Sequence, residues 1–504
     1  MQGYRVLALN RGEKQGILKV HCEHNLDVMT RFVEARFKEK NAYIQKAIQE
    51  ALKKKIIPAM ERRIRSELTE RAEDGAISLF AQNLRNLLLV SPLKGKMVLG
   101  FDPAFRTGAK LAVVDKTGKL LTTQVIYPVP PANQTKIAQS KKDLAQLIED
   151  FGIEIIAIGN GTASRESEAF VAEVLKDYPA VSYVIVNESG ASVYSASELA
   201  RKEFPDLTVE KRSAISIARR LQDPLAELVK IDPKAVGVGQ YQHDMPQKRL
   251  NETLDGVVES CVNSVGVDLN TASAPLLARV AGVTKATAKN IVARREEEGA
   301  FTSRAQLKKV KGLGPKAFEQ CAGFLRLPEA KNRLDATAVH PESYPAAKAL
   351  LEACGYSTAD IGTPALSGLP EQVKRQRKTL CQTLEIGEPT LLDIVSELCK
   401  PGRDVRDSLP KPQLRSDVMG MEDLKPGMVL TGTVRNVIDF GAFVDIGVHQ
   451  DGLVHISQIT NRYIKHPGEV LKVGDIVQVK ILGVDVPKKR ISLTMKGLEQ
   501  AAAK

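Results

Sequence analysis

Aromatic rings and cations lie close together in the last part of the chain. The residues concerned are Phe440, Phe443, His455, Lys488, Lys489 and Arg490. Rings on the outer surface of a small domain, next to positive charges, form a platform on which unpaired bases stack, a contact worth about 1–3 kcal/mol per base. This combination makes these six residues the first candidates for a nucleic-acid site.

Alternating apolar residues around these side chains predict five short strands. The expected strands are 429–437, 441–446, 452–456, 476–484 and 490–495. Glycines between them suit the bends of a small closed β-barrel of the OB-fold type. Phe440 and Phe443 are three positions apart, so on a regular strand they would face opposite sides. Either both rings fill the core, or one does, or a bulge at Gly441 re-aims them.

This stretch closely resembles the ribosomal S-one RNA-binding motif along its whole length. The matching strings begin at Gly427, Phe440, Asp451, Val473 and Arg490. The resemblance implies that Phe440, Phe443, His455 and Arg490 line a face that binds single-stranded RNA. The domain is expected to cover residues 421–497.

Two glycine turns lie between helical segments further upstream. The candidates for backbone binding are Lys311, Gly312, Gly314 and Lys316 at the second turn, and Gly282 and Lys285 at the first turn. Tight glycine turns expose backbone N–H groups that can donate hydrogen bonds to phosphate oxygens. At the first turn, Thr284 stands where a second glycine is expected, which places the phosphate contact of that turn in doubt. The pair resembles a tandem helix-hairpin-helix module, which holds a DNA or RNA backbone without reading sequence; a plain turn used for packing is the alternative.

Strands alternate with helical stretches from Met97 to about residue 230, which predicts an α/β domain. Asp102 ends one strand in the run Phe-Asp-Pro-Ala-Phe-Arg-Thr-Gly, and Glu188 follows another. The first run resembles the YqgF/RuvC branch of ribonuclease-H-like folds. In that branch acids at these places bind catalytic Mg²⁺, and three or four carboxylates surround a two-metal site.

The third acid of that pattern is missing. Arg212 stands where the family has an aspartate before small residues, and a guanidinium cannot bind a metal ion. Arg212 could pair with Asp102 or Glu188, or contact a phosphate. Asp223 lies about three helical turns further along, too far to substitute. We therefore treat Asp102 and Glu188 as vestigial, with no catalytic residues, no metal site and no cofactor; Mg²⁺ would be needed only if the nuclease alternative held.

Composition sets the broader limits. The 504 residues carry 72 Lys and Arg against 60 Asp and Glu, a net charge of +12 that favours phosphate-bearing partners. The six cysteines include no CxxC pair, so we expect free thiols in a reducing compartment. No apolar run is long enough to span a membrane, and no signal pattern opens the chain, so the cytoplasm is the expected location. His21, Cys22, Glu23 and His24 cannot all converge on a metal, and a structural role is expected for them.

Read in order, these parts resemble the Tex family of bacterial transcription accessory proteins. The resemblance runs from residue 4 to 497, with long matching strings that begin at Tyr4, Phe101, Asn187, Ala218, Val238 and Val262. Members carry a further N-terminal helical region, so the chain is expected to be a fragment. The fold class is multi-domain α+β and α/β. The expected domains are a helical segment (1–95), a YqgF/RNase-H-like domain (96–230), a tandem helix-hairpin-helix (231–330), a related helical domain (331–415) and the OB-fold barrel (421–497).

These parts together predict a scaffold in transcription that binds RNA, and also DNA, by base stacking and backbone contacts without catalysis. Two alternatives remain open. One is a metal-dependent nuclease of the RNase-H-like class. The other is a ribosome-associated translation factor, because this type of barrel serves both processes. The expected partners are single-stranded RNA and DNA, with RNA polymerase or the ribosome as the protein assembly, and no membrane.

Overall fold

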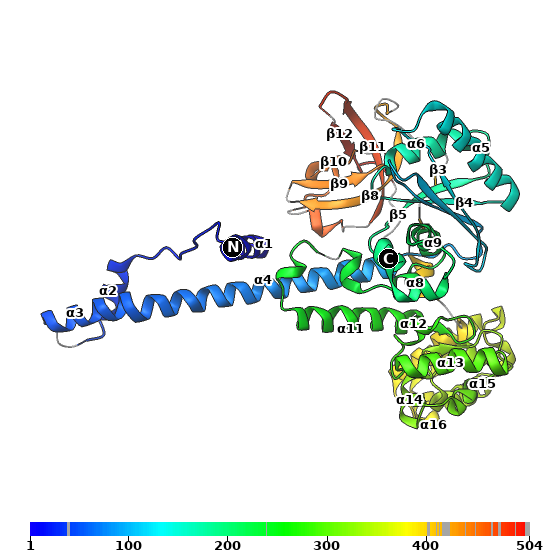
Figure 1. Ribbon diagram of the computed structural model, residues 1–504. Coiled ribbons are helices and arrows are strands. Elements are labelled where there is room, and N and C mark those ends of the chain that lie inside the picture. Colours follow the sequence, from blue (N-terminus) through cyan, green and yellow to red (C-terminus); the bar gives the residue numbers. More distant parts are fainter. Residues whose placement is uncertain are drawn as a thin grey trace. The chain divides into compact units, whose positions relative to one another are not determined.

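The computed structural model describes residues 1–37, 41–237, 239–400, 404–409, 411–412, 414–415, 424–438, 440–448, 450–464, 467–471, 475–488 and 490–498. The chain forms two compact units, each built from two separate stretches (Figure 1). The helical unit comprises Met1–Leu89 and Leu228–Asp404. The sheet–barrel unit comprises Val90–Glu227 and Val405–Lys504.

A five-stranded mixed sheet forms the first part of the sheet–barrel unit. Its strands are β1 (Val98–Asp102), β2 (Ala109–Val114), β3 (Leu120–Ile126), β4 (Ile155–Gly159) and β5 (Ser182–Val186). The order is β3-β2-β1-β4-β5, with β1, β4 and β5 parallel and the first three strands forming an antiparallel meander. The parallel arrangement brings the carboxyl ends of β1, β4 and β5 to one edge of the sheet.

Helices cover both faces of this sheet. They are α5 (Gln134–Phe151), α6 (Ser164–Leu175), α7 (Ala191–Ala196), α8 (Glu198–Glu203), α9 (Val209–Gln222) and α10 (Pro224–Leu228). Leu144 of α5 and Val171 of α6 belong to the core on one face, whereas Ala214 and Ala218 of α9 belong to the core on the other. A side chain at Gly100 would collide with the Ala214 carbonyl oxygen, so α9 rests directly on β1. The sheet is thus the α/β domain that the sequence predicts.

The second part of the unit is a closed barrel of five strands. They are β8 (Val429–Ile438), β9 (Gly441–Asp445), β10 (Gly452–His455), β11 (Ile476–Asp485) and β12 (Arg490–Thr494). The closed order is β10-β12-β11-β8-β9, and inward residues such as Val434, Val444 and Leu493 fill the interior. The predicted OB-fold barrel is confirmed, with strand bounds that differ by at most a residue or two.

The segment that joins the two units packs against the sheet, although the sequence grouped residues 331–415 as one helical domain. Arg406 is fully buried and donates to a carboxylate oxygen of Asp223 at 2.7 Å. Arg415 exchanges two backbone hydrogen bonds with Tyr183 of β5, at 2.9 and 2.7 Å. These contacts place Arg406 and Arg415 with the sheet, because their hydrogen-bond partners belong to it or to the end of α9.

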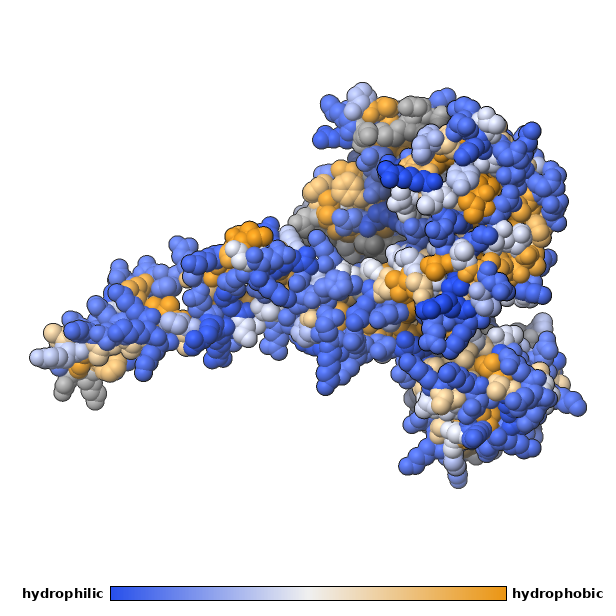
Figure 2. All heavy atoms as spheres, viewed as in Figure 1, coloured by the Kyte–Doolittle hydropathy of each residue, from blue (hydrophilic) through white to orange (hydrophobic). Residues whose placement is uncertain are grey.

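The helical unit begins with a long helical run. Its first helices are α1 (Gly3–Lys14), α2 (Leu26–Glu34), α3 (Ala42–Ala51), a π-helical turn (Leu52–Ile56) and α4 (Ile57–Leu88). Both α1 and α11 (Gln247–Val265) pack against α4. Arg11 fastens α1 to the later part of the unit by donating to Asp244 at 2.7 Å. Hydrophobic side chains lie between hydrophilic ones on the surface of α2, α3 and α4 (Figure 2). The ring of Tyr43 on α3 is exposed.

The rest of the helical unit consists of short helices joined by tight turns. They are α12 (Ala274–Leu277), α13 (Lys285–Glu298), α14 (Pro315–Cys321), α15 (Tyr344–Ala353), α16 (Leu369–Leu384) and α17 (Glu388–Cys399), with β6 (Val267–Asp268) paired to β7 (Leu325–Arg326). The buried Arg304 donates to the carbonyls of Leu325 and Val339 at 2.6 and 2.8 Å and thereby joins the two halves. Among the described residues, no helix is both long and apolar enough to cross a membrane.

Candidate nucleic-acid interface

The two phenylalanines of the barrel both lie outside its core. On β9, Ala442 and Val444 are buried in the interior, so Phe443 between them faces outward and is half-buried. Phe440 lies in the turn before β9 and is 53% exposed. The alternative in which both rings fill the core is wrong. The bulge also lies elsewhere than expected, because the register of β8 against β9 shifts between Val434 and Asn436 and not at Gly441.

His455 lies beside Phe440. It is the last residue of β10 and pairs with Gly441 of β9, while the next residue, Ile456, donates its N–H to the Phe440 carbonyl at 2.8 Å. The exposed imidazole is oriented by Ser457, whose Oγ lies 2.9 Å from Nδ1. The backbone therefore holds one ring from the turn and one from β10 at the same end of the outer surface.

The cations occupy the opposite end of this surface. Arg490 opens β12 and is exposed, and Lys488 lies in the preceding turn, 3.6 Å from an Asp485 oxygen. The parallel pairing of Leu453 with Ser492 puts Arg490 level with residue 451, four residues from the level of His455. At about 3.3 Å per residue the two ends are roughly 13 Å apart, with Phe443 between them. Lys489 lies outside the described residues.

Asn436 is a neighbour of this surface that the sequence did not single out. It lies directly across from Phe443 on β8, and Leu453 lies across from Phe443 on β10. Asn436 is exposed, so its amide is beside the ring on which a base would stack. The bulge at Arg435 hides this placement from the sequence, because one extra residue reverses the expected in–out alternation.

The two glycine turns pack against each other's helices. Gly282 and Gly312 have φ of +79° and +83°, a backbone conformation that favours glycine. A side chain at Gly282 would lie 2.7 Å from Cβ of Gln320 on α14. In return, Asn290 of α13 donates to the Lys311 carbonyl at 2.8 Å. This reciprocal packing explains why the turns occur as a pair.

The two turns differ in what they leave free. Thr284 accepts a hydrogen bond from the N–H of Thr287 at 3.2 Å and so caps its own helix. Gly314 precedes Pro315 and has no side chain to cap α14. Lys311 and Lys316 are exposed beside it, as Lys285 is beside the first turn. The second turn therefore offers the freer backbone.

Asp102 and Glu188 meet at the carboxyl edge of the sheet. Burial raises the pKa of Asp102, although a hydrogen bond from Ser213 and the charge of Lys110 partly offset this effect. The pKa of Glu188 is raised by burial and then by repulsion from Asp102. Side chains at Gly159 or Gly161 would collide with the Glu188 carboxylate, so the absence of side chains at these two glycines leaves room for it.

Arg212 does not pair with either acid, contrary to one expectation. Its guanidinium is buried and donates to the carbonyls of Phe204 and Ser195 at 3.2 and 3.3 Å. The α9 residue that reaches Asp102 is the next one, Ser213, because a helix turns about 100° per residue. Asp223, which follows α9, pairs instead with Arg406 at 2.7 Å.

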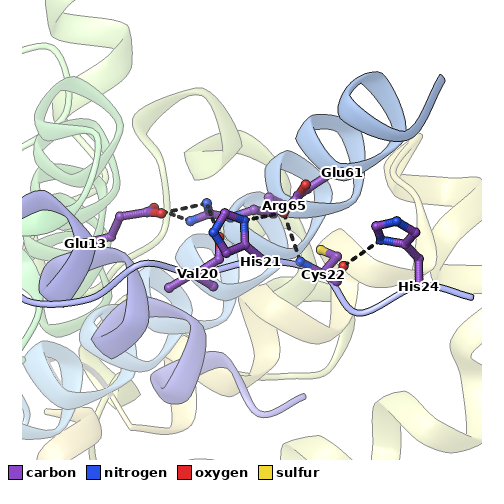
Figure 3. Close-up of polar contacts among 7 residues, drawn as sticks. All are labelled: Glu13, Val20, His21, Cys22, His24, Glu61 and Arg65. Carbon is purple, nitrogen blue, oxygen red and sulfur yellow. Dashed lines mark hydrogen bonds and ion pairs between the residues drawn. The ribbon is translucent and has the colours of Figure 1, made fainter. Parts of the chain in front are cut away.

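The His21–His24 segment is held by ordinary polar contacts (Figure 3). The N–H of Cys22 donates to Glu61 at 2.9 Å, and Nδ1 of His24 lies 3.1 Å from the Cys22 carbonyl. The two imidazole rings are well separated in the close-up. Across the part of the chain that the structure describes, no three His, Cys, Asp or Glu side chains are placed to hold a metal ion.

Four family models match consecutive parts of the chain. They are the Tex protein YqgF-like domain (residues 96–222), the helix-hairpin-helix motif (262–326), the HHH domain (332–406) and the S1 RNA binding domain (423–496). Their order is the order of the sheet, the paired turns, the second helical half and the barrel. The chain therefore carries nucleic-acid-binding domains of two kinds.

Relatives match nearly the whole length of this chain. "Uncharacterized protein YdcI" of Bacillus subtilis is 57% identical over 98% of this chain and 69% of its own length. "Protein YhgF" of Escherichia coli is 49% identical, over 99% and 65%. "Transcriptional accessory protein Tex" of Neisseria gonorrhoeae is 48% identical, over 98% and 66%. The chain thus spans about two thirds of the length of these relatives, and it belongs to the Tex family of transcription accessory proteins.

Proposed function

We propose that this chain binds single-stranded RNA on the outer face of its barrel, while the glycine turns hold nucleic-acid backbone. The observation that carries the proposal is the outward placement of Phe443, with Phe440 and His455 at one end of its face and Arg490 at the other. Exposed aromatic rings are unfavourable in water and do not stabilise the core, and stacking against bases accounts for their outward placement.

The proposal includes binding without catalysis. Of the acids expected around two catalytic metals, Asp102 and Glu188 are present, and a serine reaches toward Asp102 from α9. A hydroxyl is a poor substitute for a carboxylate at a two-metal site. Cleavage that requires Mg²⁺ or Mn²⁺ and disappears in Asp102→Ala would contradict this part of the proposal.

The proposed setting is transcription, in line with the printed name of the Neisseria gonorrhoeae relative. The competing role in translation is separated by co-sedimentation of the intact protein from a cell lysate. Association with RNA polymerase and not with ribosomes supports the transcription role, and the reverse result supports the translation factor.

The central test compares matched aromatic substitutions. Phe443→Ala should weaken binding of a single-stranded oligonucleotide by roughly 10-fold or more, because it removes the ring on which one base stacks. Tyr43→Ala is the control, since Tyr43 is an exposed ring on α3 of the helical unit. Fluorescence anisotropy with labelled RNA measures both. Equal losses in the two variants would show that the barrel face is not the stacking surface.

A further inference from the structure

A buried lysine lies opposite the first acid of the nuclease-like site. Lys110 is 6% exposed and pairs directly with Asp102 across β1 and β2. Residues paired in this way have their Cβ atoms about 4.5–5.5 Å apart on the same face of the sheet. The ammonium group also donates to the hydroxyl of Thr107, in the turn between the two strands. Since lysine is almost never buried unless paired, its location calls for a negative partner.

The second acid has a buried cation of its own. Arg220 of α9 is 4% exposed and donates to the carbonyls of Asn187 and Ser189, on either side of Glu188, at 2.9 and 2.7 Å. Its Nε and Nη2 have no hydrogen-bond partner among the described residues, and neither does Oε2 of Glu188. Burial lowers the pKa of Arg220 to about 10, and the charges of Glu227 and then of Glu188 act against that effect. Two buried cations therefore lie near Asp102 and Glu188, and the second also faces the buried Glu227.

This donor set does not fit a divalent metal ion. Mg²⁺ takes oxygen ligands in an octahedral shell, and beside Asp102 it would meet the positive charge of the ammonium of Lys110, the cross-strand partner of Asp102. The third ligand from α9 would be the Ser213 hydroxyl, which already donates to Asp102. The ribonuclease-H-like fold implies a metal at this edge, and the residues present disagree with it.

We propose that Lys110 is the resident counter-charge of Asp102, and that its ammonium stands in for the divalent metal that neutralises this carboxylate in nucleases of this fold. Arg220 supplies positive charge on the side of Glu188, where it also faces Glu227. The sheet edge then carries positive charge of its own on the side of Asp102. It needs no metal to fold, and nucleic-acid binding by the whole chain is insensitive to chelators.

The proposal is tested on the full chain at pH 8 by hydrogen–deuterium exchange of residues 98–114 and by Mn²⁺ binding in electron paramagnetic resonance. Lys110→Met keeps the length of the side chain and removes its charge. We expect faster exchange in β1 and β2, a melting temperature lower by about 5 °C or more, and recovery of both on adding Mg²⁺. The unsubstituted chain should show no change between Mg²⁺ and EDTA.

Two further variants keep the test decisive. Lys116→Met removes an exposed lysine from the next turn and should change nothing. Lys110→Met combined with Asp102→Asn removes both charges, and it should fold without metal even if the single variant does not.

Three results would each overturn the proposal. One is Mn²⁺ binding by the unsubstituted chain that Asp102→Asn abolishes. Another is a single variant that folds and does not respond to Mg²⁺. The third is failure of both the single and the double variant to fold, which would show that the stem of Lys110 and not its charge is required.

Discussion

Single residues at the sheet edge have surroundings that determine their charge. Glu188 has a raised pKa because it is partly buried and faces Asp102. A carboxyl group whose pKa is higher in the folded protein favours folding when protonated, and that contribution is lost as pH rises through the folded pKa. Above the ordinary pKa of a glutamate the carboxyl group of Glu188 therefore lowers the free energy of unfolding of the sheet.

Glu188→Gln should raise the thermal stability of the sheet–barrel unit at pH 7, since it keeps the shape and removes the buried charge. The gain should shrink as pH falls toward the ordinary pKa of 4.5, where the native carboxyl group is itself protonated. Calorimetry of both proteins between pH 4.5 and 8 checks this. A gain that is constant across the range would mean that hydrogen bonding, and not charge, accounts for the effect.

Elements decide which residues of a motif matter, as the second glycine turn shows. Gly312 has φ of +83°, whereas Gly314 has φ of −75° and a side chain there would meet open space. The repeated glycine in the sequence therefore has two different meanings. One is demanded by backbone conformation, and the other leaves room in front of α14.

Gly312→Ala should destabilise the helix-hairpin-helix part by about 1 kcal/mol or more, because alanine is strained at positive φ. Gly314→Ala should leave stability within about 0.5 kcal/mol. Urea unfolding monitored by hydrogen exchange of residues 262–326 measures the difference between the two. If Gly314→Ala proved the more damaging, backbone strain would not be the reason for the first glycine.

The proposed stacking surface and the glycine turns proposed to hold backbone lie in different units of the chain. Stacking depends little on salt, whereas each phosphate contact releases counterions and steepens the salt dependence of affinity. The net charge of +12 is consistent with several such contacts. We therefore expect base stacking on the barrel to contribute mainly to the affinity, and phosphate contacts at the glycine turns to contribute mainly to its dependence on salt.

Removing residues 421–504 should lower RNA affinity at every salt concentration. The double substitution Lys311→Gln with Lys316→Gln should instead reduce the slope of log affinity against log salt by about 0.7 for each phosphate that the lysines no longer neutralise. Titration of binding from 50 to 300 mM salt measures both quantities. An unchanged affinity and slope after removal of the barrel would contradict the central proposal.

The sequence alone determined the strands of the barrel, the α/β sheet, the paired glycine turns and the family, because local alternation and turn residues are read directly from the order of residues. It also placed Asp102 and Glu188 at strand ends. Only the tertiary structure decided which way side chains face. A bulge in β8 set the neighbour of Phe443, one residue of helical rotation exchanged Arg212 for Ser213, and strand pairing brought Lys110 to Asp102. Register and rotation depend on how elements pack, and a shift of one residue changes the face.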